Sequence, residues 1–196
     1  MAIRCWSPMV EKAIRVSAAA HHGQFRKGSQ LPYLLHPAAV ALILVRAGFV
    51  DDDVIAAAIL HDTLEDTDVT IDFLRTEFSP EVCEIVEGAS EHKVDRDGRV
   101  RPWQDRKREH IERIRTAPPQ VRAVVLADKL HNLQSIVVDL KALEPVWERF
   151  NASKAAVLWY HGEIIEAASC NRASIAPDIR LVNLAAECRG LIEKLR

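Results

Sequence analysis

Ile55-Ala-Ala-Ala-Ile-Leu-His-Asp-Thr-Leu-Glu-Asp-Thr67 begins as an apolar helix and then places a histidine and an aspartate at core positions. On a helix Asp62 shares a face with Ile59, and His61 shares one with Ala57, so both polar side chains are expected to point inward. An inward carboxylate is costly unless it is neutralised or meets a cation, and the adjacent imidazole makes a metal ion the natural cation. This stretch therefore predicts a central helix that carries part of a metal site.

The composition predicts a single, soluble, all-α domain over residues 1–196. Of the 196 residues 48% are hydrophobic and only 6% are aromatic, and the few Gly and Pro residues lie between periodic segments rather than inside them. No stretch of useful length alternates like a strand. A net charge of −2 gives no general preference for nucleic acid or for a membrane. The absence of an apolar signal core and the four scattered cysteines predict reduced thiols and a cytoplasmic protein.

Capping residues and helix breakers predict where the other helices begin. Ser7-Pro8 and Ser79-Pro80 each read as an N-cap followed by a first helical residue, and Pro37 opens a helix with His36 immediately before it. The expected helices cover about 7–22, 37–45, 51–67, 70–88 in two pieces, 102–116, 119 onward, 145–170 and 177–195. Residues 90–101 have little periodicity and predict a loop or a lid.

Inward-facing polar groups recur on other helices. After Pro119 an apolar stripe turns polar at Asp128, as the central helix does at Asp62. Together with His36 and His61 these residues offer two imidazoles and two carboxylates, a mixed set that suits one divalent ion, Mn²⁺, Fe²⁺, Zn²⁺ or Ni²⁺. Their convergence is a prediction about the fold. The alternative is that each histidine is a hydrogen-bonded core residue, which is the commoner case for a single inward histidine.

Further charged residues accompany this set. Glu65 and Asp66 each follow a proposed ligand by one helical turn, where a carboxylate can orient or deprotonate a water molecule at the metal. They could also be simple charges near a helix end. Lys107 falls on the inward stripe of its helix, and with Arg26 and Lys27 in an earlier loop it could offset phosphate charge.

Four stretches, taken in order and spacing, resemble the HD-domain phosphohydrolases, in particular small single-domain relatives of the hydrolase half of the RelA/SpoT alarmone enzymes. They are His21-His-Gly-Gln-Phe-Arg-Lys27, Pro32-Tyr-Leu-Leu-His-Pro37, His61-Asp-Thr-Leu-Glu-Asp-Thr67 and Ala127-Asp-Lys-Leu-His-Asn132. They span about residues 18–132, and helices at about 145–195 follow. The resemblance implies an HD-type helical bundle with the metal site between its central helices.

The resemblance also implies roles for individual residues. It implies metal ligands, usually for Mn²⁺, at His36, His61, Asp62 and Asp128, and a catalytic acidic pair at Glu65 and Asp66. Arg26 and Lys27 match residues beside a guanine base, and Asn132 matches a residue near the ribose. The implied reaction is removal of the 3′-pyrophosphate from (p)ppGpp, which gives GDP or GTP and pyrophosphate.

Two departures from the family pattern lie around the substrate. Gly88-Ala-Ser-Glu-His-Lys93 replaces a Gly-Val-Thr-Lys-like stretch, and Gly28 stands where a hydroxyl residue is often found. Two alternatives therefore stay open: action on another nucleotide, such as a nucleoside monophosphate or NADPH, and an inactive nucleotide-sensing module. The helices at 145–195 could pack on the domain or on a partner, so a homodimer is also left open.

Overall fold

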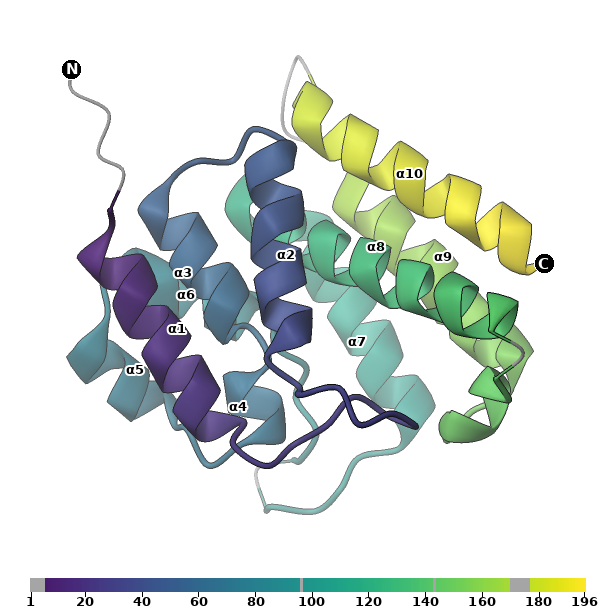
Figure 1. The fold of residues 1–196 in the computed structure, drawn as a ribbon, viewed down its shortest axis with the longest axis horizontal. Coiled ribbons are helices and arrows are strands. Elements are labelled where there is room, and N and C mark those ends of the chain that lie inside the picture. Colours follow the sequence, from purple (N-terminus) through teal and green to yellow (C-terminus); the bar gives the residue numbers. More distant parts are fainter. Residues whose placement is uncertain (1–5, 96, 143, 170–176) are drawn as a thin grey trace.

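The computed structural model describes residues 6–95, 97–142, 144–169 and 177–196, and these ranges are built from helices without a strand element. Figure 1 shows their arrangement. In chain order the helices are α1 Pro8–Ala20, α2 Leu35–Arg46, α3 Asp52–Leu60, α4 Thr63–Asp66, α5 Ile71–Glu77, α6 Pro80–Ala89, α7 Trp103–Thr116, α8 Pro119–Lys141, the 3₁₀ helix η1 Val146–Arg149, α9 Lys154–Ser169 and α10 Ile179–Leu195.

Helix α3 lies at the centre of the fold. Every residue from Val54 to Leu60 is buried, and a helix that is apolar on all sides must be covered on all sides. Helices α1, α2, α6 and α8 pack around it. The prediction of an all-α fold organised around this segment is therefore confirmed.

Local capping chemistry accounts for several helix starts. The side chains of Ser7, Thr70 and Ser79 each accept a hydrogen bond from the backbone N–H three residues later, at the first turns of α1, α5 and α6. Asp51 caps α3 in the same way through the N–H of Asp53. Such caps satisfy first-turn N–H groups that have no partner inside the helix. Each of these residues therefore marks the point where a helix begins.

The expected continuous helix over 51–67 is wrong, because α3 ends at Leu60. His61 and Asp62 lie in a turn, and α4 is a single further turn. The hydroxyl of Thr63 donates to the Leu60 carbonyl at 2.7 Å, so a side chain occupies an acceptor that a continuing helix would use. Adjacent side chains on a regular helix point about 100° apart. In this turn, by contrast, the side chains of His61 and Asp62 can point towards the same place.

Two other helix boundaries also differ from expectation. Helix α2 begins at Leu35, so His36 lies inside its first turn; Pro37 is tolerated there because first-turn N–H groups have no helical partner. The helix expected from Pro145 is instead η1 followed by α9, and Ser153 accepts a hydrogen bond from the N–H of Ala156 where α9 starts. The expected end of that helix at Cys170 lies outside the described residues.

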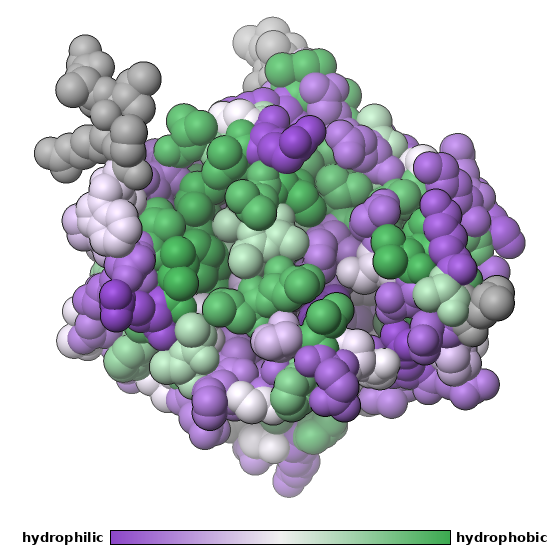
Figure 2. Space-filling model, viewed as in Figure 1, coloured by the Kyte–Doolittle hydropathy of each residue, from purple (hydrophilic) through white to green (hydrophobic). Residues whose placement is uncertain are grey.

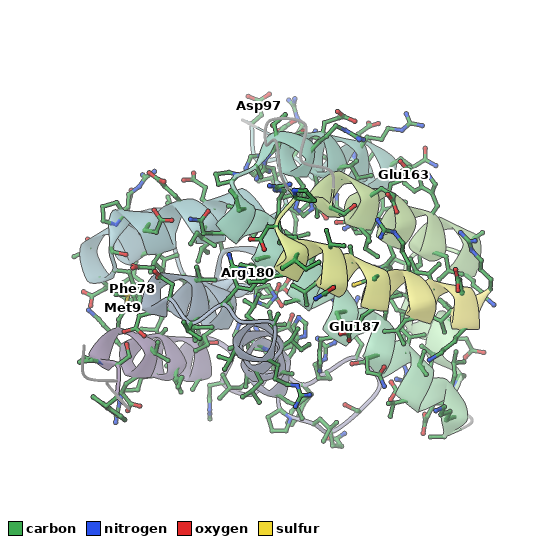
Figure 3. The ribbon with its side chains drawn as sticks, turned by 90° about the horizontal axis from the view of Figure 1, so that it is seen from above. Met9, Phe78, Asp97, Glu163, Arg180 and Glu187 are labelled. Atoms are coloured by element: carbon green, nitrogen blue, oxygen red, sulfur yellow. The ribbon has the colours of Figure 1, made fainter. Side chains whose placement is uncertain are left out.

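The C-terminal helices pack on the domain itself. Helix α10 lies along α8 and α9, and α9 also packs against α7. Arg180, labelled in Figure 3 at the first turn of α10, stacks on the Phe49 ring at 4.0 Å and donates to the Gly48 carbonyl. These contacts join α10 to the end of α2. Within the part of the chain that is described, no helix has both the length and the apolar character needed to cross a membrane.

Candidate metal centre

Three of the four predicted metal ligands, His36, His61 and Asp128, place ligand atoms within 4.8 Å of one another between α2, the α3–α4 turn and α8, and Asp62 lies beside them. Nε2 of His36 lies 3.0 Å from Oδ1 of Asp128 and 3.4 Å from Oδ2 of Asp62. Nε2 of His61 lies 3.3 Å from Oδ1 of Asp62 and 3.8 Å from Oδ1 of Asp128. Two imidazole nitrogens and the carboxylate of Asp128 thus face a shared space that Asp62 borders, and the binding of a metal by all four residues stays a prediction.

The hydrogen bonding of His61 fits a metal ligand. Its Nδ1 lies 2.7 Å from the Ala58 carbonyl, which can only accept, so Nδ1 carries a proton and Nε2 is the nitrogen that faces the carboxylates. That Nε2 is buried and has no hydrogen-bond partner among the described residues. A buried Nε2 that faces two carboxylates is favourable only when it binds a cation, which is a proton in the metal-free protein and can be a metal ion, so this donor set suits a divalent ion.

His36 is held from behind by His131. The two Nδ1 atoms are 2.7 Å apart, so one nitrogen must donate and the other accept. Burial, together with the charges of His36 and Arg26, lowers the pKa of His131 to about 4, and the neutral ring can accept the proton of His36. This leaves Nε2 of His36 free to face the carboxylates, so His131 orients a predicted ligand from outside the cluster.

Polar groups beside the cluster hold its two carboxylates. Tyr33 donates to Oδ2 of Asp62 at 2.6 Å, and its pKa is raised by burial and by that carboxylate, so it stays protonated. Lys129 lies 2.6 Å from Oδ2 of Asp128, and Asn132 donates to Oδ1 of the same residue at 2.6 Å. The sequence predictions included Asn132 but neither Tyr33 nor Lys129, although both lie inside the quoted motifs next to predicted ligands.

The predicted acidic pair lies on α4 beside this cluster. The side chain of Glu65 is only 18% exposed, and its Oε1 accepts from the backbone N–H of Glu91 at 2.7 Å. Burial and the charge of Asp62 raise the pKa of Glu65 to about 7. A carboxyl group with such a pKa can both accept and release a proton at neutral pH. Asp66 is held by Lys93 at 2.5 Å and by the Tyr33 hydroxyl at 3.2 Å.

A cavity of about 130 Å³ opens over the cluster, and Arg26, Lys107 and Lys129 give its wall cationic groups beside the carboxylates. Arg26 lines it and donates to Oδ1 of Asn132 at 3.0 Å. Lys107 also lines it, as its place on the inward stripe of α7 predicts; it pairs with Glu91 and lies 4.3 Å over the Tyr160 ring. Lys27 is exposed and is not among the lining residues, so the structure does not bring it to the cavity.

His110 is a lining residue that sequence reasoning missed. It is 4% exposed, its Nδ1 lies 3.0 Å from the Tyr160 hydroxyl, and its buried Nε2 has no partner in the ranges that are described. Burial and the charge of Lys129 lower its pKa to about 3, so the ring is neutral at pH 7. The sequence signal that could have identified His110 was its position on the same face of α7 as Lys107 and Ile114.

Two loops border the cavity. Gly28 has φ +72°, and a Cβ on it would lie 2.2 Å from Nε of Arg149, whose guanidinium bonds Asp139 and Glu144. The loop that carries Arg26 therefore has no room for a side chain at residue 28. In the segment 90–101, Val94 and Val100 form an isolated antiparallel bridge. This segment carries Lys93, which contacts the acidic pair; its closure over a substrate stays a prediction.

A sequence model described as HD domain matches residues 13–149, which is more than half of the chain. The chain belongs to the HD-domain family. The chain is 39% identical over 127 residues to the human guanosine-3′,5′-bis(diphosphate) 3′-pyrophosphohydrolase MESH1, covering 64% of this chain and 68% of the relative. It is 35% identical over 127 residues to the pyrophosphohydrolase of the same name from Haemophilus influenzae, covering 62% of this chain and 18% of that protein.

Two solved structures are similar to this chain. One, described as a metazoan ortholog of SpoT that hydrolyses ppGpp and plays a role in starvation responses, superposes with a TM-score of 0.77 at 26% identity and covers 98% of both chains. A structure from Listeria monocytogenes superposes with a TM-score of 0.66 at 32% identity, covering 81% of this chain and 99% of its own.

Proposed function

We propose that this HD domain is a metal-dependent hydrolase that removes the 3′-pyrophosphate of (p)ppGpp. The observation that carries the proposal is the position of Glu65, a largely buried carboxyl with a pKa of about 7 in the metal-free protein, in a cavity that the grouped donors His36, His61 and Asp128 share with cationic side chains. The curated relatives named above are pyrophosphohydrolases of the same nucleotide, and the chain covers about two thirds of the human protein. Water would add to phosphorus, the bond to O3′ would break, and O3′ would take a proton.

His36, His61, Asp62 and Asp128 would hold one divalent ion, with Mn²⁺ our first choice. Two imidazoles and two carboxylates without a thiol suit Mn²⁺ or Fe²⁺ as well as Zn²⁺. When bound, the ion supplies Lewis acidity at the phosphoryl group and makes water more acidic. The tautomer of His61, set by the Ala58 carbonyl, and the position of His36, set by His131, support this assignment.

Glu65 would accept the proton of the attacking water. Its pKa near 7 lets it take a proton in one step and release it afterwards at neutral pH. Asp66 would carry the proton towards O3′, and Tyr33 and Lys93 hold its carboxylate for that task. The Glu91 N–H fixes the orientation of the Glu65 carboxyl, so the acceptor oxygen does not have to be positioned during the reaction.

The cationic wall would bind the phosphates. Lys107 and Lys129 supply ammonium groups, and Nε2 of His110 adds a neutral donor when the Tyr160 hydroxyl donates to its Nδ1. Arg26, already hydrogen-bonded to Asn132, would contact the nucleoside end of the substrate. Lys27 is exposed and would contribute only by contacting the bound base from outside the cavity.

The test is a product assay with ppGpp and added Mn²⁺. Release of pyrophosphate together with GDP supports the proposal, whereas orthophosphate release from a nucleoside monophosphate or NADPH supports another HD-type phosphatase. Glu65→Ala should retain Mn²⁺ and lose turnover. The matched control is Asp68→Ala, which removes an exposed carboxylate three residues later and should retain both. Binding of ppGpp without turnover by the Mn²⁺-loaded protein would establish a sensing module instead.

A further inference from the structure

Tyr160 on α9 contacts three other side chains that line the cavity. Its hydroxyl has one hydrogen-bond partner in the described part of the chain, Nδ1 of His110 at 3.0 Å. Its ring centroid lies 4.3 Å from Nζ of Lys107 and 5.4 Å from Nζ of Lys129. Figure 2 shows hydrophobic surface gathered in the region of α1 and α2, and the buried Tyr160 on α9 is not part of it. A tyrosine that only filled the core would not need two ammonium groups over its ring.

The Tyr160 hydroxyl determines which nitrogen of His110 carries the proton. Burial raises the pKa of Tyr160, so the hydroxyl keeps its proton and can donate it. Its one acceptor is Nδ1 of His110, so the proton of that neutral ring lies on Nε2. This Nε2 is buried, and no described residue accepts its proton. A buried N–H without an acceptor is costly, so an oxygen of a ligand in the cavity is the partner that it fits.

The Tyr160 ring lies beside two like charges. Burial, and then the charge of Lys129, lower the pKa of Lys107, which means that the two ammonium groups repel each other. Glu91 pairs with Lys107 and Asp128 with Lys129, so each ammonium group has its own carboxylate. The ring adds an attraction that both share, because ammonium groups within about 6 Å of an aromatic centroid are attracted to its face. Tyr160 therefore opposes the repulsion that would separate these groups.

We propose that Tyr160 is a positioning residue for the phosphate-binding side of the cavity. Its hydroxyl presents the Nε2–H of His110 as a neutral donor, and its ring keeps Lys107 and Lys129 beside that donor. One neutral donor and two ammonium groups suit a pyrophosphate group, whose charge is spread over several oxygens. This inference deepens the proposed function and rests on it. Tyr160 acts through these three side chains.

The tautomer of His110 can be measured by ¹⁵N NMR of the protein in EDTA, without any substrate. The signals of His110 are those that disappear in His110→Gln. Wild-type protein should carry the proton on Nε2, whereas Tyr160→Phe should show a second population with the proton on Nδ1. A proton on Nδ1 in the wild type, or the same tautomer ratio in both proteins, overturns the role of the hydroxyl.

A double-substitution cycle separates positioning from a general structural effect. Tyr160→Phe should raise KM for ppGpp about 10-fold and change kcat by less than about 2-fold, since the donor contacts phosphate before and during the reaction. In a His110→Gln background, where the amide donates without the hydroxyl, the same change should alter KM less than about 2-fold. Glu163→Gln, an exposed residue of α9 labelled in Figure 3, is the control and should leave KM unchanged. Equal effects in the two backgrounds overturn the proposal.

Calorimetric titration of the Mn²⁺-loaded protein with pyrophosphate tests the ring. Tyr160→Leu should raise the pyrophosphate Kd at least about 10-fold above that of Tyr160→Phe, which keeps the ring. Equal Kd values for the two folded variants overturn the role of the ring, and melting curves show that each is folded. The phenylalanine variant decides the role of the hydroxyl even where leucine is not tolerated. Wild-type protein that does not hydrolyse ppGpp refutes the proposed function, whereas the tautomer and pyrophosphate measurements still decide the role of Tyr160.

Discussion

Glu65→Gln should stabilise the metal-free protein while it removes turnover. The Glu65 side chain is largely buried, and burial followed by repulsion from Asp62 raises its pKa from 4.5 to about 7. Glutamine keeps an oxygen for the N–H of Glu91 but cannot ionise, so the cost of placing a second negative charge beside Asp62 disappears. The weak ion pair with Lys93, at 3.7 Å, is lost as well.

The size and sign of this effect follow from the pKa. Because the folded pKa lies above the unfolded one, the folded protein keeps a proton that the unfolded chain releases as pH rises above 4.5. The stability from this proton is complete below pH 4.5 and is lost as pH rises through 7, at about 1.4 kcal/mol per pH unit. We expect Glu65→Gln to gain about 2–3 kcal/mol at pH 7.5, which in a chain of this length raises Tm by about 5–10 °C.

Thermal unfolding followed by circular dichroism in EDTA measures the difference. At pH 5 the two proteins should melt within about 2 °C of each other, and the gap should widen up to pH 7.5. Asp68→Asn, which removes an exposed carboxylate three residues away, should show no such widening. A gap that is the same at every pH, or a glutamine variant that is less stable at pH 7.5, would refute the reasoning.

Three other substitutions probe the centre. Tyr33→Phe removes the donor to Asp62 and should weaken Mn²⁺ binding about 10–100-fold in calorimetric titrations; an unchanged affinity contradicts the orienting role. His61→Ala should lose bound metal and hydrolysis together, measured as metal content and pyrophosphate release, and retained metal would remove it from the ligand set. Glu91→Ala leaves Lys107 without its carboxylate and should cost about 2–4 kcal/mol in urea unfolding, whereas a neutral effect means that the pair is solvated.

The sequence predicts the helical fold and the ligand cluster because both depend on periodicity. Asp128 interrupts the apolar stripe of α8, and Asp62 follows the apolar run of α3 in the turn after it. A stripe identifies the inward face of a helix before any tertiary contact is known. The break after Leu60 could not be predicted in this way, since the apolar pattern continues through it. It depends on the competition of Thr63 for one carbonyl.

The site residues that the sequence did not predict were missed for other reasons. Tyr33 lies in a loop without periodicity, and its role arises only when the loop lies against Asp62. His110 was on a recognisable face of α7, yet its free nitrogen becomes evident only once Tyr160 is placed beside it. Lys27 is a predicted substrate residue that does not line the cavity, because a matched motif position does not determine where an exposed side chain points.

The close approach of Gly28 to Arg149 makes two distant positions interdependent. Any side chain at residue 28 would displace the guanidinium from Asp139 and Glu144, and the loop would lose its support from the segment after α8. A loop transplanted from a relative with a hydroxyl residue at this position should therefore displace the Arg149 side chain, and shortening Arg149 at the same time should remove the clash. Under the proposed function, in which Arg26 on this loop contacts the nucleoside end, the loop and a residue 121 positions after Gly28 would have to change together.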